Sequence, residues 1–83
     1  MLAQKKQLAN AELLWNLERQ IVQRTLGRVR DLHVETQDNR VVVRGFTPSY
    51  FVKQLAIQAS LEVLDLEHTP RELDIQLDVL TRD

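Results

Sequence analysis

The residue types that most often carry metal binding or catalysis are few in this chain and lie far apart. His33 and His68 are the two histidines, and cysteine is absent. A metal site needs several histidine, cysteine or carboxylate ligands that converge on one ion, and these histidines lie alone on different segments. Both are interpreted as exposed polar positions, so we expect no metal and no cofactor.

Hydroxyl and carboxylate side chains form no catalytic arrangement in the sequence either. Nucleophilic catalysis needs a hydroxyl or thiol beside a base and an orienting group. Thr47 and Ser49 stand where a helix is expected to start, and Ser60 stands within that helix. Asp74 and Asp78 share one expected strand, but an open three-stranded sheet offers no cleft that tunes carboxylates for acid–base work. With two glycines and no glycine-rich phosphate loop, the sequence predicts a protein that is not an enzyme.

Cations near the end of the first expected helix are candidate contacts for an anion. Arg24, Arg28 and Arg30 follow one another there, and Lys53 lies on the second expected helix. One interpretation is that they bind lipid phosphate or another anion. The other, which we favour for the arginines, is that cations suit the negative end of a helix dipole and stay solvated.

Length and charge narrow the class of protein. Eighty-three residues suffice for one domain, and 11 Lys and Arg stand against 12 Asp and Glu. This balance speaks against a nucleic-acid partner. No apolar run approaches the roughly 20 residues that cross a bilayer, and the first residues lack the apolar core of a signal peptide. A chain this short buries only about 60% of its unfolded surface, and oligomerisation is one common source of further stability.

A first helix is expected from Ala11 to Leu26, because this stretch contains neither glycine nor proline and Gly27 follows it. Residues 1–10 are a polar extension that either frays or lengthens this helix, and residues 11–83 form the domain. One broad side of the helix collects apolar side chains at about 100° per residue: Leu14, Trp15, Leu17, Ile21, Val22 and Leu26. Glu18 falls inside that side, either reaching water or marking where the core face narrows.

A hairpin is expected next, because residues 32–37 alternate between apolar and polar and residues 40–46 form a second strand. The two residues between them, Asp38-Asn39, suit a two-residue turn. One register places all the apolar side chains on a single face, and it pairs Thr36 with Val41, Val34 with Val43 and Leu32 with Gly45. Gly45 is expected to mark a bulge or a close backbone approach.

The second helix is expected over residues 48–64, with Thr47 as its N-cap and Pro48 at its first position. Its core face is predicted to hold Val52, Leu55, Ala56, Ala59 and Val63. Residues 73–79 alternate as a third strand. The sequence thus predicts an α+β two-layer sandwich of order α-β-β-α-β, with two helices on one face of a three-stranded mixed sheet.

Outward charges predict the strand order. A crossover through the second helix makes the second and third strands parallel. Arg40 and Arg44 point away from the helices on the second strand, as Asp74 and Asp78 do on the third. Side by side, these residues would form the pairs Arg40–Asp74 and Arg44–Asp78. The predicted order is first, second, third, with the second strand central.

This order and its motif resemble the BON domain, a small bacterial module. The most specific stretch is D-N-R-V-V-V-R-G-F-T-P-S, residues 38–49, followed by Ala56 and Ala59 in the helix. The likeness covers roughly residues 14–80, although the family's glycine before the last strand has no counterpart in residues 64–70. The resemblance implies a non-catalytic interaction or phospholipid-binding domain. It also suggests the periplasm or envelope, while a cytoplasmic location stays open.

The second helix is also apolar on the side opposite its core face, where a monomeric two-layer domain is normally polar. Four residues make up this candidate partner-binding set: Tyr50, Ile57, Leu61 and Leu64. We expect them to bind a protein partner or a second copy of the chain; the alternative is attachment to anionic phospholipid. Membrane docking favours Lys and Arg beside an apolar stripe. Here Lys53 is accompanied by the acidic residues Glu62, Asp65 and Glu67, which favours the protein partner.

Overall fold

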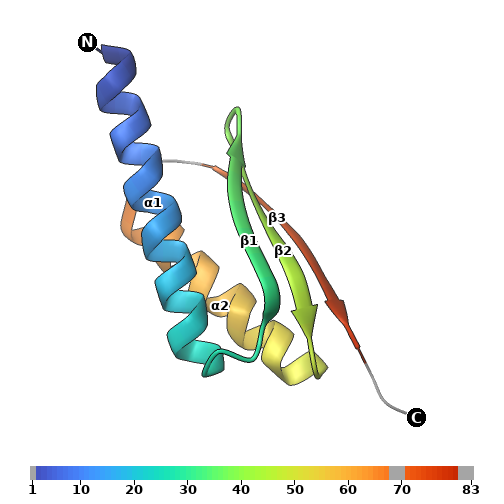
Figure 1. The fold of residues 1–83 in the computed structure, drawn as a ribbon. Helices are drawn as coiled ribbons and strands as arrows, with labels where there is room; N and C mark the ends of the chain where they lie inside the picture. The colour runs from blue at the N-terminus through green and yellow to red at the C-terminus, as the bar shows by residue number, and fades with distance from the viewer. Residues whose placement is uncertain (1, 68–70, 81–83) are drawn as a thin grey trace.

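The structure is a computed structural model that describes the backbone of residues 2–67 and 71–80 and the side chains of residues 11–66 and 71–80. Its elements are α1 (Leu2–Thr25), β1 (Arg30–Gln37), β2 (Arg40–Thr47), α2 (Tyr50–Glu67) and β3 (Glu72–Val79). Both helices lie on the same face of the sheet (Figure 1). The predicted α+β class and element order are therefore confirmed.

Helix α1 begins well before residue 11, so the polar extension lengthens the helix rather than fraying from it. The helix ends in a pair of backbone hydrogen bonds: Gly27 N–H donates to the Val22 carbonyl at 2.9 Å, and Leu26 N–H donates to the Gln23 carbonyl at 3.4 Å. This pattern is the Schellman motif. Its left-handed position is occupied by Leu26, with φ +55°, and Gly27 follows with φ +72°.

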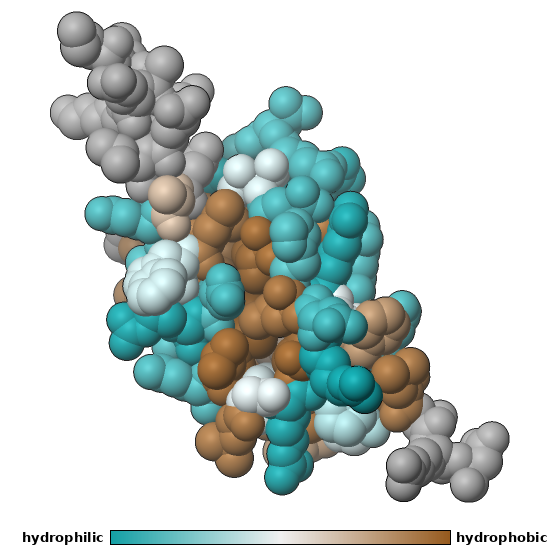
Figure 2. Space-filling model, viewed as in Figure 1, coloured by the Kyte–Doolittle hydropathy of each residue, from teal (hydrophilic) through white to brown (hydrophobic). Residues whose placement is uncertain are grey.

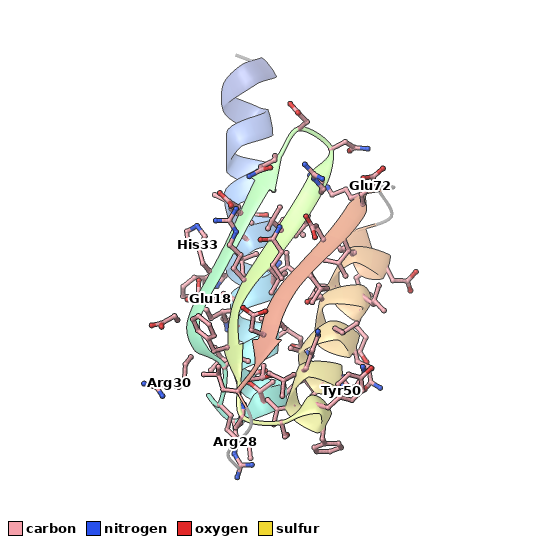
Figure 3. All side chains as sticks on the ribbon, turned by 90° about the vertical axis from the view of Figure 1, so that its right-hand side faces the viewer. Glu18, Arg28, Arg30, His33, Tyr50 and Glu72 are labelled. Atoms are coloured by element: carbon pink, nitrogen blue, oxygen red, sulfur yellow. The ribbon has the colours of Figure 1, made fainter. Side chains whose placement is uncertain are left out.

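The buried side of α1 is narrower than the sequence predicted. Four residues at successive i, i+4 positions are buried: Leu13, Leu17, Ile21 and Thr25. Trp15, Val22 and Leu26, expected on the core side, are 61%, 44% and 80% exposed. The prediction was wrong for them because α1 contacts α2 and β1 along one narrow stripe. Glu18 is exposed beside that stripe, where the core face narrows (Figure 3).

The hairpin is confirmed in its turn and in most of its register. Thr36 lies opposite Val41 and Val34 opposite Val43, with Asp38 at φ +56° in the turn. Nearer the start of β1 the register shifts between Arg30 and His33, so the expected regular pairing of Leu32 with Gly45 is replaced by a bulge.

Gly45 is the close backbone approach that the sequence predicted. A Cβ atom there would lie 2.9 Å from Val29 Cγ1 and 3.0 Å from the Arg30 carbonyl oxygen, and φ is +156°. Only glycine fits this crossing of β1 and β2 without displacing backbone. The bulge and the glycine together let the start of β1 lie close on β2.

The strand order β1-β2-β3 is confirmed, with β2 central and β3 parallel to it. The register runs without a shift from Arg40 opposite Glu72 to Thr47 opposite Val79. Val42 is 1% exposed although it points away from the helices, so β2 is buried on both faces at Val41–Val43, while Arg40, Arg44 and Phe46 are exposed on the outer face.

One of the two predicted cross-strand ion pairs forms. Arg40 Nη1 lies 3.9 Å from Asp74 Oδ2, whereas Arg44 Nη2 lies 3.3 Å from Glu35 Oε1 on β1. The prediction of an Arg44–Asp78 pair was wrong. The register places Phe46, not Arg44, opposite Asp78, and Glu35 is the nearer acid.

Helix α2 begins two residues later than predicted, because its N-cap is Ser49 and not Thr47. Ser49 Oγ accepts a hydrogen bond from Val52 N–H at 3.2 Å, and the Ser49 carbonyl accepts one from Lys53 N–H at 3.2 Å. Thr47 is buried and continues the sheet, since its carbonyl accepts a hydrogen bond from Leu80 N–H at 2.8 Å.

The predicted core face of α2 is largely confirmed. Val52, Ala56, Ala59 and Ser60 are buried, and Leu55 and Val63 are half-buried. The core cluster joins both helices to the sheet and consists of Leu13, Leu17, Ile21, Val41, Val43, Ala56, Ala59 and Leu77.

Candidate interaction surfaces

The side chains considered for catalysis serve the backbone instead. Ser60 Oγ donates to the Ala56 carbonyl at 2.9 Å, Ser49 caps α2, and Thr47 Oγ1 donates to the Asp78 carbonyl at 3.5 Å. His33 is exposed, 3.9 Å from a Glu35 carboxylate oxygen. His68 lies outside the described residues. Across the described part of the chain, no three His, Cys, Asp or Glu side chains group as metal ligands.

The predicted partner-binding residues, here called the α2 stripe, comprise Tyr50, Ile57, Leu61 and Leu64. Tyr50 is 65% exposed and Leu61 is 53% exposed. At about 1.5 Å per residue these two lie roughly 16 Å apart along the helix. Ile57 is half-buried, and Leu64 is half-buried against the core cluster. The stripe therefore has two exposed side chains, Tyr50 and Leu61, and two half-buried ones, Ile57 and Leu64.

Helix α2 lies beside the free edge of β3. Figure 3 shows the outer face of the sheet, and there α2 stands beyond β3 on the side away from β2. On its helix-facing side, β3 carries Leu73 and Ile75, both half-buried against the core cluster. Helix α2 thus extends past the last strand of the sheet.

Acidic side chains accompany the α2 stripe. Glu62 and Asp65 are exposed on the same helix. The Glu62 carboxylate forms an ion pair with the guanidinium of Arg24. Arg24 was a candidate anion contact, and the structure shows its guanidinium engaged in this pair between α1 and α2.

A second exposed apolar group, here called the end patch, comprises Leu26, Tyr50, Phe51 and Leu80. Their exposed fractions are 80%, 65%, 70% and 52%. The end of α1 and the start of α2 lie at the same end of the molecule (Figure 1). Leu80 follows β3, and its N–H donates a hydrogen bond to the carbonyl of Thr47, the last residue of β2 before α2.

Cations lie at the same end of the molecule as the end patch. Arg28 precedes β1 and Arg30 is its first residue; both are exposed at the end that holds Tyr50 (Figure 3). Lys53 is half-buried in the first turn of α2. Sequence reasoning named these cations but missed Phe51, Leu26 and Leu80. The adjacent pair Tyr50-Phe51 was the available signal, because consecutive helix residues diverge by about 100° and share no buried face.

Leu26 combines exposure with an unfavourable backbone conformation. In the left-handed region a residue with a Cβ costs roughly 1–2 kcal/mol, which is why glycine usually fills this place. Leu26 recovers little of this by burial, since 80% of it is exposed.

A groove of about 650 Å³ between α1 and the end of α2 has a largely polar lining that includes Asn16, Gln20 and Gln23. Figure 2 shows apolar surface between α1 and β1, two elements that contribute the half-buried Leu14 and Leu32 to the rim of the core. No helix in the described part of the chain is long and apolar enough to span a bilayer.

In comparisons with protein-family models, with curated proteins and with solved structures, no match to this chain was found. The resemblance to the BON domain therefore rests on the motif residues alone.

Proposed function

We propose that this chain is a non-catalytic interaction module that binds a protein partner through the α2 stripe. The exposure of Tyr50 and Leu61 supports this function most directly. Among the described residues, neither belongs to the core cluster or packs against it, and more than half of each side chain is exposed. Aligned apolar side chains that a domain leaves uncovered mark interaction sites.

Site-specific photo-crosslinking in the organism of origin tests this proposal. A photo-reactive residue in place of Leu61 is expected to give a discrete adduct of higher mass. The same residue in place of Asp38, in the hairpin turn, is the control and is expected to give none. An absent adduct at 61, or equal adducts at both positions, contradicts the proposal. An adduct with a second copy of the chain identifies self-association.

A second candidate function is peripheral attachment to anionic phospholipid through the end patch. The observation in its favour is the combination of exposed Leu26 and Phe51 with Arg28 and Arg30 at one end of the molecule. Apolar side chains that enter the headgroup region beside cations that meet phosphate are the usual elements of such docking. The resemblance to the BON domain implies the same class of ligand.

Co-sedimentation with anionic and with neutral vesicles tests the second candidate. The wild type is expected to bind anionic vesicles at low salt and to dissociate as salt rises. Leu26→Gly is an informative variant because it relieves the left-handed strain, and it is expected to stay folded and bind less. Leu66→Gln, at an exposed position near the other end of α2, is the matched control. Absence of binding to anionic vesicles at low salt removes this candidate.

A further inference from the structure

The two edges of the sheet are built differently. Edge strands expose unpaired backbone groups, and proteins commonly block such edges with bulges, prolines or irregular backbone. β1 is interrupted by the bulge between Arg30 and His33, with Asp31 at φ +53°. β3 pairs with β2 in an unbroken register over its whole length, and it contains no proline and no residue with positive φ. The edge of β3 is therefore an open template for another strand.

Two hydrogen bonds identify the backbone groups on that edge. Glu72 N–H donates to the Asn39 carbonyl at 3.1 Å, and Leu80 N–H donates to the Thr47 carbonyl at 2.8 Å. Successive residues of a strand point their N–H and C=O groups to opposite sides. Because the register has no shift, the even-numbered residues of β3 face β2. The free edge thus presents the N–H and C=O groups of Leu73, Ile75, Leu77 and Val79.

A strand added at this edge would be covered on one face. Its side chains on the helix side would lie over α2, which stands beyond β3 in Figure 3. Helix α2 carries the half-buried Ile57 and the exposed Leu61, so apolar side chains are favoured at alternate positions of the added strand.

The other face of β3 is acidic. Glu72, Asp74 and Asp78 share it, and Arg40 partly balances Asp74 at 3.9 Å. Opposite charges in directly opposed cross-strand positions stabilise a pair of strands, and like charges destabilise it. Antiparallel pairing of β3 with its own copy would place acids opposite acids. If the two-fold axis of the strand pair passes through Gln76, Asp74 lies opposite Asp78 of the other copy. If the axis passes through Ile75, Glu72 lies opposite Asp78. A basic strand is complementary, and a second copy is not.

We infer that the free edge of β3 binds an extended segment of a partner protein in which Lys or Arg alternates with apolar residues. The segment adds a fourth strand, with its apolar side chains on the α2 stripe and its cations facing the acids of β3. This inference rests on the proposed protein-binding function of the α2 stripe and specifies the partner's chemistry.

The test uses the whole chain and a capped synthetic peptide that alternates Lys and Val. Binding is measured by fluorescence anisotropy, and amide hydrogen exchange is followed residue by residue. On binding, exchange should slow at Leu73, Ile75, Leu77 and Val79, whose N–H groups otherwise face solvent. A peptide of the same composition with its Lys and Val in separate blocks is the control. Equal binding of the two peptides, or binding without this protection, overturns the inference.

Charge reversal provides the second arm. Asp78→Lys is expected to weaken binding of the Lys–Val peptide by roughly five- to tenfold and to strengthen binding of a Glu–Val peptide. Glu18→Lys makes the same charge change on the exposed side of α1 and is expected to leave both affinities unchanged. Equal effects of the two variants would attribute the binding to net charge and overturn the inference.

The results separate this inference from the function beneath it. If a partner crosslinks at Leu61 but the Lys–Val peptide does not bind, the proposed function stands. The inference of a basic partner strand at β3 is then overturned. Protection of the free-edge amides without peptide, in a chain that light scattering shows to be dimeric, assigns the edge to a second copy and overturns the inference.

Discussion

The two helices of the single layer bury opposite kinds of side chain. α1 buries large residues such as Leu17 and Ile21 and is otherwise mainly polar on its described surface. α2 buries the small residues Ala56, Ala59 and Ser60, while Tyr50 and Leu61 stand outside. The large side chains of α1 thus fill the core, whereas the small side chains of α2 allow this helix to lie close to the rest of the core. Val52 is also buried, so the large residues of α2 that remain available to another molecule are exposed ones such as Tyr50 and Leu61.

The largest expected effect concerns the inserted volume of α1. Leu17→Ala removes a side chain with 0% exposure from the centre of the core. It should lower the free energy of unfolding by about 3 kcal/mol, because truncation of a buried leucine loses transfer energy and leaves a cavity. Urea denaturation followed by circular dichroism measures it. A loss below about 1 kcal/mol would show that α1 does not depend on this insertion.

A small-to-large substitution tests whether small side chains allow α2 to lie close to the sheet. Ala59→Leu adds volume where Ala59 has 0% exposure, and it should cost about 2 kcal/mol through displaced neighbours. Gln58→Leu, at the adjacent exposed position, is the control and should change stability by less than about 0.5 kcal/mol. If both variants are equally stable, the small residues are not what sets the helix–sheet distance.

The start of α2 gives a smaller effect. Ser49→Ala removes the oxygen that accepts the Val52 N–H hydrogen bond and should cost about 1 kcal/mol. Measured in the same urea assay, it should exceed the effect of Ser49→Asp, which keeps an acceptor at the N-cap. Equal losses from the two variants would mean that the cap contributes no net stability.

The smallest expected effect belongs to the outer face of α2. Leu61→Glu should change the free energy of unfolding by less than about 0.5 kcal/mol, because the side chain is half exposed and outside the core cluster. A loss comparable with that of Leu17→Ala would place Leu61 in the core and end the contrast between the two helices.

The alternation of the strands was enough to predict most of the hairpin register, and the outward charges of the second and third strands predicted the central place of β2. Period-2 patterns allow one register that buries all the apolar side chains, so Val34 and Val43 had one arrangement open to them. The wide side of α1 was predicted wrongly, because a helical wheel shows which residues share a side but not how much of that side a neighbour covers. Trp15 and Leu26 lie outside the covered part.

The candidate surfaces were predicted less completely than the fold. The α2 stripe follows from helix periodicity within one segment. The end patch joins Leu26, Phe51 and Leu80 from three segments, and only the tertiary arrangement brings these together. The engagement of Arg24 with Glu62 likewise depends on the distance between two helices, which no local pattern contains.

The burial of β2 on both faces has a consequence for the kinetics of folding. β1 and β2 are joined by a two-residue turn, and hairpins of this kind close in about 1–10 μs. β3 can pair only after the chain has passed through α2, so its closure is slower. During that interval Val41, Val42 and Val43 form an uncovered edge with high β-propensity, the type of segment that seeds intermolecular pairing. Refolding yield should therefore fall as protein concentration rises, and the folded protein should be insensitive to it.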